Sequence, residues 1–220
     1  MDKVIGIKEA IKDIRDGDTL MIGGFMANGA PEKLIDALIE KGVKDIILIS
    51  TDTGLITTGS GKLIAKKLVK KLYASHIGTN KETGRQMNEG ETEVELVPQG
   101  TLVERIRAGG YGLGGILTKT GLGTLVEDGK PRITVDGEEY LLEKPLKADF
   151  ALIHAAKADR NGNLVYKGST NNFNHVMTAA AEVTIVEADE VVENGEIDPN
   201  FVHTPGVFVN HVVDGGAING

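Results

Sequence analysis

The sequence predicts an α/β fold: an open, largely parallel sheet flanked by helices on both faces, with a glycine-rich loop and a β-hairpin as elaborations. Short apolar runs alternate with segments of helical periodicity, which is the order of elements in α/β proteins. Several runs are apolar at successive positions, as strands covered on both faces are. Glycine provides 29 of the 220 residues, against a usual share of about 7%, and the glycines gather between the predicted elements.

The N-terminal half alternates helices and strands. Ile7, Ile11 and Ile14 share one face of a predicted helix over Ile5–Arg15, which Asp16-Gly17 ends. The alternation continues with a strand at Thr19–Ile22, a helix at Pro31–Gly42, a strand at Asp45–Thr51, a helix at Gly61–Lys71 and an apolar run at Lys71–Gly78.

From Glu93 onward the chain continues the pattern around a long loop. Asp136-Gly137 lies between alternating residues and predicts the turn of a β-hairpin over Arg132–Glu143. The other predicted elements are strands at Glu93–Pro98, Asp149–Asp159, Val183–Val192 and Thr204–Val213, helices at Thr101–Ala108 and Asn172–Glu182, and the loop Gly109–Thr124. Because no segment lacks apolar residues for long, we expect a single domain over residues 1–220.

Composition narrows the classes of function. A net charge of −8 argues against a nucleic-acid partner, although a local site can still bind an anion. There is no cysteine, and no apolar stretch approaches the roughly 20 residues of a membrane span. We therefore expect a cytoplasmic protein that does not bind membranes.

The histidines do not have the spacing of metal ligands, so no metal site is expected. They are His76, His154, His175, His203 and His211. His76 and His154 lie in apolar runs and are predicted to be core or near-core groups.

The stretch GGFMANGAP, from Gly23 to Pro31, joins a predicted strand to a predicted helix. A glycine-rich turn at a helix N-terminus presents free backbone N–H groups and a positive dipole end, which favour a phosphate, a carboxylate or an oxyanion. A tight structural connection between strand and helix would also use glycine. The residues alone leave both interpretations open.

A second glycine-rich stretch, GYGLGG from Gly110 to Gly115, formally matches G-x-G-x-x-G. The dinucleotide-binding motif needs a strand before it and a helix after it, and here a helical pattern comes first. The loop could face a ligand or partner, or lie on the surface as a mobile segment. The sequence also lacks the G-x-S-x-G and G-x-x-x-x-G-K-[ST] motifs.

The segment Asp16–Pro31, DGDTLMIGGFMANGAP, resembles the signature of the family I (3-oxoacid type) coenzyme A-transferases: D-G, two residues, three apolar residues, G-G-F, three residues, G, any residue and P. The resemblance spans nearly the whole chain. ASHIGTNKETGRQM, VELVPQGTLVERIRAGGYGLGGILTKTGLGT and GNLVYKGSTNNFNHVMTAAAEVTIVE are similar to the α subunits of bacterial acetate and butyrate–acetoacetate CoA-transferases.

This resemblance implies the function and the partner. Such enzymes move coenzyme A from a short-chain acyl-CoA to a free carboxylate such as acetate, butyrate or acetoacetate. A glutamate of the β subunit forms a glutamyl–CoA thioester, which is covalent carboxylate catalysis. We accordingly expect an α2β2 assembly, no catalytic residue and no permanently bound cofactor in this chain, and coenzyme A or acyl-CoA as substrate. The coenzyme A-binding residues implied by the resemblance are Gly23, Gly24, Phe25, Met26, Ala27, Asn28 and Gly29.

Two details bear on this expectation. Val192–Gly195, VENG, resembles the Ser-Glu-Asn-Gly motif of the catalytic glutamate, but valine replaces the serine, so Glu193 is predicted to lie in a structural turn. Thr51 stands where related chains often have asparagine, which affects the expected acyl specificity. The alternatives are a self-sufficient enzyme with its own carboxylate nucleophile, and a non-catalytic α/β protein that binds an anion or nucleotide at the same turn.

Overall fold

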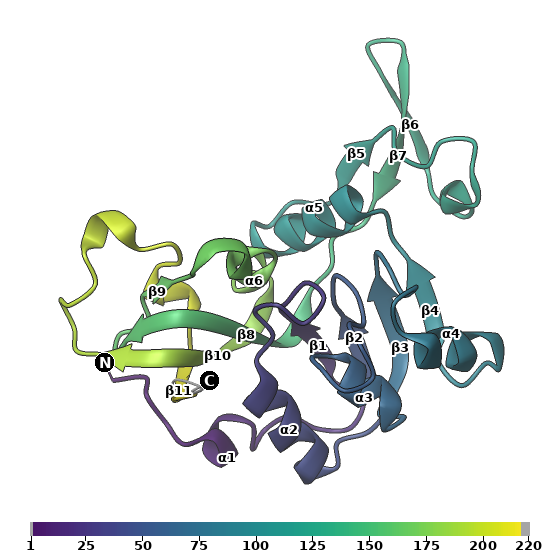
Figure 1. Ribbon diagram of the computed structural model, residues 1–220. Coiled ribbons are helices and arrows are strands. Elements are labelled where there is room, and N and C mark those ends of the chain that lie inside the picture. The colour runs from purple at the N-terminus through teal and green to yellow at the C-terminus, as the bar shows by residue number, and fades with distance from the viewer. Residues whose placement is uncertain (1, 217–220) are drawn as a thin grey trace.

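The computed structural model describes residues 2–216 and is built around one twisted sheet (Figure 1). The strand order is β11-β10-β8-β1-β2-β3-β4, and each neighbouring pair on this path is parallel. The strands are β1 (Thr19–Ile22), β2 (Ile46–Ile49), β3 (Val69–Ala74), β4 (Glu93–Leu96), β8 (Ala148–Asp159), β10 (Ala181–Val192) and β11 (His211–Asp214). The short β9 (Leu164–Val165) pairs antiparallel with β8.

The chain reverses its direction of travel across the sheet beside β1. From β1 it adds β2, β3 and β4 on one side, and it then returns to place β8, β10 and β11 on the other side. β1 therefore lies between the two halves, with β2 and β8 as its neighbours.

Helices cover both faces of the sheet. Leu20 and Ile22 of β1 pack in the cluster that includes α1 (Ile7–Ala10), α2 (Glu32–Lys41) and α3 (Gly61–Ala65). Met21, between them, packs in the opposite cluster with α5 (Gln99–Gly110) and α6 (Asn174–Met177). This alternation of side chains across a strand confirms the predicted α/β fold.

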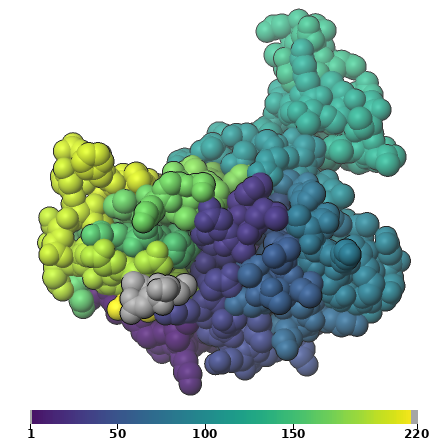
Figure 2. Space-filling model, viewed as in Figure 1, coloured from purple at the N-terminus to yellow at the C-terminus, as the bar shows by residue number. Residues whose placement is uncertain are grey.

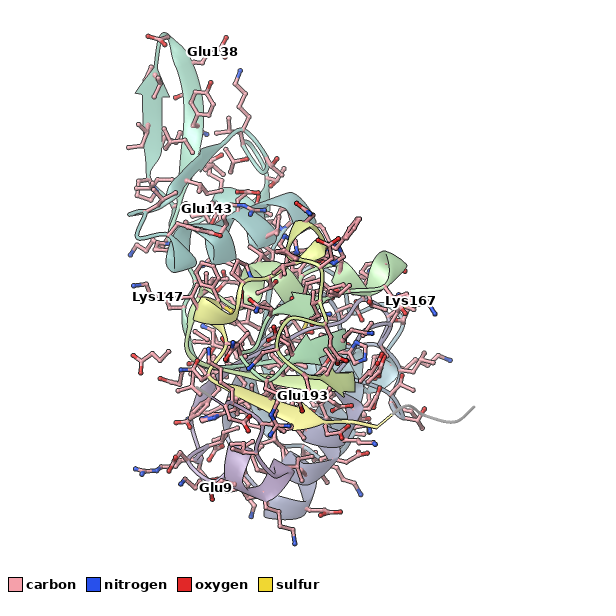
Figure 3. The ribbon with its side chains drawn as sticks, turned by 90° about the vertical axis from the view of Figure 1, so that its left-hand side faces the viewer. Glu9, Glu138, Glu143, Lys147, Lys167 and Glu193 are labelled. Atoms are coloured by element: carbon pink, nitrogen blue, oxygen red, sulfur yellow. The ribbon has the colours of Figure 1, made fainter. Side chains whose placement is uncertain are left out.

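A three-stranded antiparallel sheet projects from α5 as an arm (Figures 1 and 2). It consists of β5 (Ile116–Thr118), β6 (Arg132–Val135) and β7 (Glu138–Glu143) in the order β5-β7-β6. Asp136 and Gly137 both have positive φ, so the predicted hairpin turn is confirmed. Figure 3 shows Glu138 toward the free end of the arm and Glu143 at its base.

The remaining elements are short 3₁₀ turns and one more helix. The turns are η1 (Leu125–Glu127), η2 (Gly168–Asn171), η3 (Pro199–Phe201) and η4 (Gly206–Phe208). The helix α4 (Lys81–Asn88) packs beside α3. Of the described helices, none is long and apolar enough to cross a membrane.

Several predicted boundaries are wrong. The helix expected over Ile5–Arg15 is the single turn α1, which starts after Gly6, although Ile11 and Ile14 are buried as expected. The helix expected over Gly61–Lys71 ends at Ala65, because Lys67 has a positive φ and β3 begins at Val69.

The predicted elements near the C-terminus are also shorter. The helix expected over Asn172–Glu182 is one turn, because β10 already begins at Ala181 and extends alongside β8. The strand expected over Thr204–Val213 begins only at His211, after η4. The loop expected over Gly109–Thr124 contains the end of α5 and the strand β5.

Candidate functional site

The loop from Gly23 to Gly29 begins at the carboxyl end of β1. This is the place where the chain reverses across the sheet, and open α/β sheets bind their ligands in the crevice at such a point. The N–H of Gly23 donates to the carbonyl of Leu152 in β8 over 3.0 Å, so the loop leaves the sheet only after this bond. The fold thus places the predicted site where a ligand site is expected on topology alone.

The centre of the loop is a tight two-residue turn. Phe25 and Asn28 exchange backbone hydrogen bonds of 3.1 and 2.9 Å. Met26 and Ala27, between them, have φ values of 51° and 65°. Turns of this kind normally use glycine, asparagine or aspartate, since a left-handed backbone costs other residues about 1–2 kcal/mol each. Contacts outside the turn must therefore hold it.

Glycines allow the ends of the loop to pack closely. Gly24 has a φ of +115°, and a Cβ there would lie 3.1 Å from the Cβ of Ala30. A Cβ on Gly23 would lie 1.8 Å from Oδ1 of Asn174. Both positions are buried, so these two glycines allow the loop to pack against the protein beneath it.

Asp52, just beyond β2, supports the turn from one side. Its carboxylate is buried and accepts hydrogen bonds from the N–H of Met26 (2.9 Å) and the N–H of Gly54 (2.6 Å). The hydroxyl of Thr51 lies 3.0 Å from the same carboxylate and also bonds to the carbonyl of Gly24. The end of β2 is therefore tied to the loop that follows β1.

Asn172 and Asn174 support the loop from the other side. Asn172 accepts from the N–H of Gly24 (3.3 Å) and donates to the carbonyl of Asn28 (3.0 Å). Asn174 is fully buried, donates to the carbonyl of Gly29 (2.9 Å) and accepts from the N–H of His154 (3.1 Å). These amides use both donor and acceptor atoms, which a hydrophobic residue of the same size could not do.

Two cavities flank the loop. The first, about 600 Å³, is lined by Phe25, Met26, Asn28, Gln99, Ser169, Asn172 and Phe173. The second, about 400 Å³, is lined by Ala27, Asn28, Gly29, Ala30, Glu32, His154, Thr170 and Asp189. Five of the seven predicted binding residues thus face a cavity, while Gly23 and Gly24 line neither.

Gln99 is a cavity residue that was not predicted from the sequence. It is the first residue of α5 and lines the first cavity, and the hydroxyl of Ser75 bonds to its side-chain amide. The available signal was positional, because Gln99 follows Pro98 just after β4, at the same edge of the sheet as the loop.

The N-terminus of α2, which the sequence suggested as part of an anion site, already receives a carboxylate. Glu187 of β10 is buried and accepts from the N–H of Leu34 over 2.9 Å. Burial raises the pKa of Glu187, and the bond from Leu34 opposes that rise. In the described part of the loop, the N–H groups of Ala27 and Gly29 make no hydrogen bond to protein. The loop therefore keeps two unpaired donors, of which Ala27 lies in the turn and Gly29 follows it.

The two histidines expected in or near the core differ. Nε2 of His154 lies 2.9 Å from Asp189, and its side chain is only 12% exposed, as expected of a near-core group. His76 is exposed, so that expectation is wrong: β3 ends at Ala74, and His76 follows in the loop beyond it.

Glu193 lines neither of the two cavities. Its side chain is 74% exposed and lies 3.6 Å from Arg160, in the turn after β10 (Figure 3). Among the described residues that line the two cavities, the carboxylates are Glu32 and Asp189. The N–H of Gly59 and the ammonium of Lys62 already bind Glu32.

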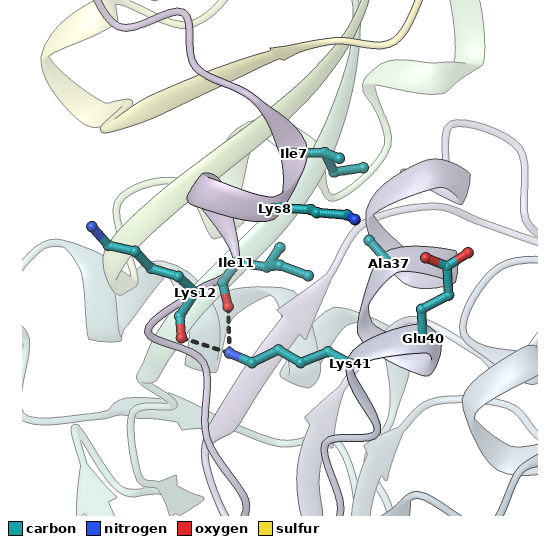
Figure 4. Close-up of a pocket in the computed structure, with 7 residues that line it drawn as sticks. All are labelled: Ile7, Lys8, Ile11, Lys12, Ala37, Glu40 and Lys41. Carbon is teal, nitrogen blue, oxygen red and sulfur yellow. Dashed lines mark hydrogen bonds between the residues drawn. The ribbon is translucent and has the colours of Figure 1, made fainter.

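A further cavity of about 450 Å³ lies between α1 and α2 (Figure 4) and shares no lining residue with the two beside the loop. Nζ of Lys41 donates there to the carbonyls of Ile11 (2.7 Å), Lys12 (2.6 Å) and Ile14 (2.6 Å). Lys41 thus satisfies carbonyls at the end of a one-turn helix, which is a structural role.

Comparison with known proteins identifies the family. Residues 4–215 match the family described as "Coenzyme A transferase". The chain is 53% identical over 211 residues to the acetate CoA-transferase subunit alpha of Escherichia coli (strain K12), covering 96% of each chain. It is also 53% identical to the acetoacetyl-CoA:acetate/butyrate CoA transferase alpha subunit of Clostridium acetobutylicum, covering 96% of this chain and 97% of that one.

Solved structures show the same fold. Glutaconate coenzyme A-transferase from Acidaminococcus fermentans matches with a TM-score of 0.83 and 21% identity, over 96% of this chain and 75% of that chain. An acyl-CoA transferase from E. coli O157:H7, in a thioester complex with CoA, matches with a TM-score of 0.85 and 23% identity. The chain covers 47% of that protein's length and 96% of its own. The resemblance drawn from the Asp16–Pro31 signature is confirmed, and the chain belongs to the coenzyme A transferase family.

Proposed function

We propose that this chain is the α subunit of a two-chain CoA-transferase, which moves coenzyme A between a short-chain acyl-CoA and a free carboxylate of the acetate, butyrate or acetoacetate type. The observation that carries the proposal is the position of the Asp16–Pro31 signature. Its loop lies at the switch point of the sheet, with five residues facing two cavities. The relatives named above, which are α subunits, support the subunit assignment.

In this proposal the loop Gly23–Gly29 binds coenzyme A as a substrate, and no cofactor is held permanently. The free N–H groups of Ala27 and Gly29 suit a developing oxyanion or a carboxylate. Phe25 and Met26 are 48% and 42% exposed and offer apolar surface in the first cavity, while Ala27 and Gly29 line the second. The protein is inferred to act in the cytoplasm as a single-domain chain.

The nucleophilic glutamate is assigned to a β subunit, in an α2β2 assembly. Glu193, the glutamate that resembles the catalytic one, lines neither cavity. Glu32 is already bound by a lysine and a backbone N–H, and Asp189 lies 2.9 Å from Nε2 of His154. This distribution of carboxylates supports a nucleophile from outside the chain. It disfavours the self-sufficient enzyme considered above, and family membership disfavours the non-catalytic binding protein.

Co-expression with the β-type chain of the same cell tests the proposal. The α chain alone is expected to have no transferase activity, and the co-purified complex is expected to transfer CoA from acetoacetyl-CoA to acetate. Native mass spectrometry should show the two chains in equal numbers. Robust activity from the α chain alone, or no activity from a well-formed complex with any short-chain acyl-CoA, would contradict the proposal.

The Gly24→Val variant tests the loop within that complex. Valine is strained at a φ of +115° and its Cβ would lie 3.1 Å from Ala30. We expect the complex to assemble with lower activity and a higher KM for acyl-CoA. Unchanged kinetics would argue against a binding site at this loop.

A further inference from the structure

Asp52 is a buried carboxylate between two loops at the candidate site. Asp52 is only 3% exposed. One oxygen accepts from the N–H of Met26, in the loop Gly23–Gly29. The other oxygen accepts from the N–H of Gly54, in the loop that follows β2. A carboxylate has two acceptor oxygens, so it can accept from both N–H groups at once.

The first of these loops needs an outside contact to keep its shape. Met26 and Ala27 occupy left-handed conformations that their side chains disfavour. The bond from Met26 to Asp52 fixes the first of these two peptide groups. The next N–H, that of Ala27, makes no bond to the described protein. The direction of this free donor therefore depends on how firmly Asp52 holds Met26.

We propose that Asp52 is a positioning residue for CoA transfer: it holds the Phe25–Asn28 turn in its left-handed form, so that the free donor and the apolar side chains of the turn face the ligand. Asp52 lines neither cavity, and so it acts through the turn. The assignment of coenzyme A as the ligand of that turn rests on the proposed function.

A second substitution separates positioning from general stability. Glycine adopts the left-handed conformation without strain, so Ala27→Gly lowers the need for an outside contact. If Asp52 acts by holding the turn, its replacement should matter less when residue 27 is glycine. A residue that only stabilises the fold should have the same effect in both backgrounds.

Asp149 provides a matched control. It also accepts a backbone N–H, that of Thr19 over 2.8 Å, but at the opposite end of β1. Asp149 is on β8, and Asp149→Asn therefore makes the same chemical change beside the other end of β1, away from the loop.

The experiment uses the purified two-chain complex carrying D52N, A27G, D52N/A27G, D149N or D149N/A27G. D52N turns an amide NH₂ toward one of the two donors, so one charged hydrogen bond is lost. We expect the KM of the D52N complex for acetoacetyl-CoA to rise about tenfold as a result. The rise should shrink at least about threefold in the A27G background. D149N should leave KM unchanged in either background.

Hydrogen–deuterium exchange of the same complexes gives a result that does not depend on activity. D52N should speed exchange at the Asn28 N–H, which closes the turn, and D149N should not. This readout still tests Asp52 if the wild-type complex proves to catalyse a different reaction. Unchanged exchange, or an equal effect of D52N on KM with alanine or glycine at position 27, would overturn the proposal. If D52N assembles only together with A27G, that rescue supports it; if neither assembles, Asp52 is a folding residue and the proposal is wrong.

Discussion

The hydroxyl of Thr51 donates a hydrogen bond to the carbonyl of Gly24, which joins the end of β2 to the loop after β1. Thr51 is fully buried and lines neither cavity beside the loop. The side chain that stands in place of an asparagine thus bonds to the loop backbone, and its influence on a ligand must pass through that backbone.

Replacing Thr51 by valine is expected to destabilise the protein by about 1–3 kcal/mol, because the carbonyl of Gly24 would lose its buried partner. The KM of the complex for acyl-CoA should rise as well. Urea unfolding and steady-state kinetics measure the two effects. Thr101→Val is the matched control: in the described chain the buried hydroxyl of Thr101 has no hydrogen-bond partner, so this change should be neutral or stabilising. Equal losses in the two variants would contradict the assigned bond.

Replacing Gly23 by alanine should displace Asn174, because the new Cβ would lie 1.8 Å from Oδ1. The expected loss is about 1–3 kcal/mol, as for other overpacked sites, together with lower activity of the complex. Gly6→Ala places its Cβ where no atom lies within 4 Å and should change neither quantity. Thermal unfolding of the two variants decides, and a stable, fully active G23A would show that the loop does not depend on this close contact.

The pH dependence of stability provides a test of Glu187. Its pKa in the folded state lies above the usual 4.5, chiefly because the group is buried. Between 4.5 and the raised value the folded state binds more protons than the unfolded state, so stability should fall as the pH rises through that window. Glu187→Gln should remove this slope, as measured by urea unfolding at a series of pH values. A slope that persists in E187Q would assign it to another group.

Two carboxylates, one on α4 and one just after it, should change the stability of the protein at a lower pH than Glu187 does. Hydrogen bonds from Arg85 hold the pKa of Glu82 and of Glu91 at about 2. Their contribution is present above 4.5 and is lost as the pH falls toward 2, the opposite sign from Glu187. The same urea series distinguishes the two, since E187Q should leave the acid limb unchanged.

Substitution of Glu193 by glutamine should leave transfer activity unchanged. The side chain is exposed and lies outside the residues that line the two cavities. Steady-state kinetics of the E193Q complex provides the measurement. Loss of activity with normal assembly would assign the nucleophile to this chain.

The central strands could be predicted from the sequence because a strand that is buried on both faces is a run of consecutive apolar residues. Thr19–Ile22 was predicted with its observed limits, and the Asp136-Gly137 turn has the backbone that its residues prefer. The helix α4 has no apolar pattern of this kind, because its buried residues are Thr83 and Gln86. Gly61–Lys71 was misassigned since lysines flank Leu68 and Val69, and pairing of β3 with two neighbours decides the conformation there.

The candidate site was predicted only in part. The glycine pattern locates the loop, because close packing and left-handed backbone require glycine at Gly23 and Gly24. It does not reveal Asp52 or Asn174, which reach the loop from distant parts of the chain through hydrogen bonds. Contacts of this kind depend on the order of strands in the sheet, which no local pattern records.

In the proposed enzyme this chain binds coenzyme A, while the nucleophile comes from its partner. Incubating the complex with acetoacetyl-CoA, reducing the thioester with borohydride and mapping the peptides of both chains tests it most directly. We expect a reduced glutamate in the β subunit and none in this chain. A reduced carboxylate in this chain, whether Glu193, Glu32 or Asp189, would contradict it.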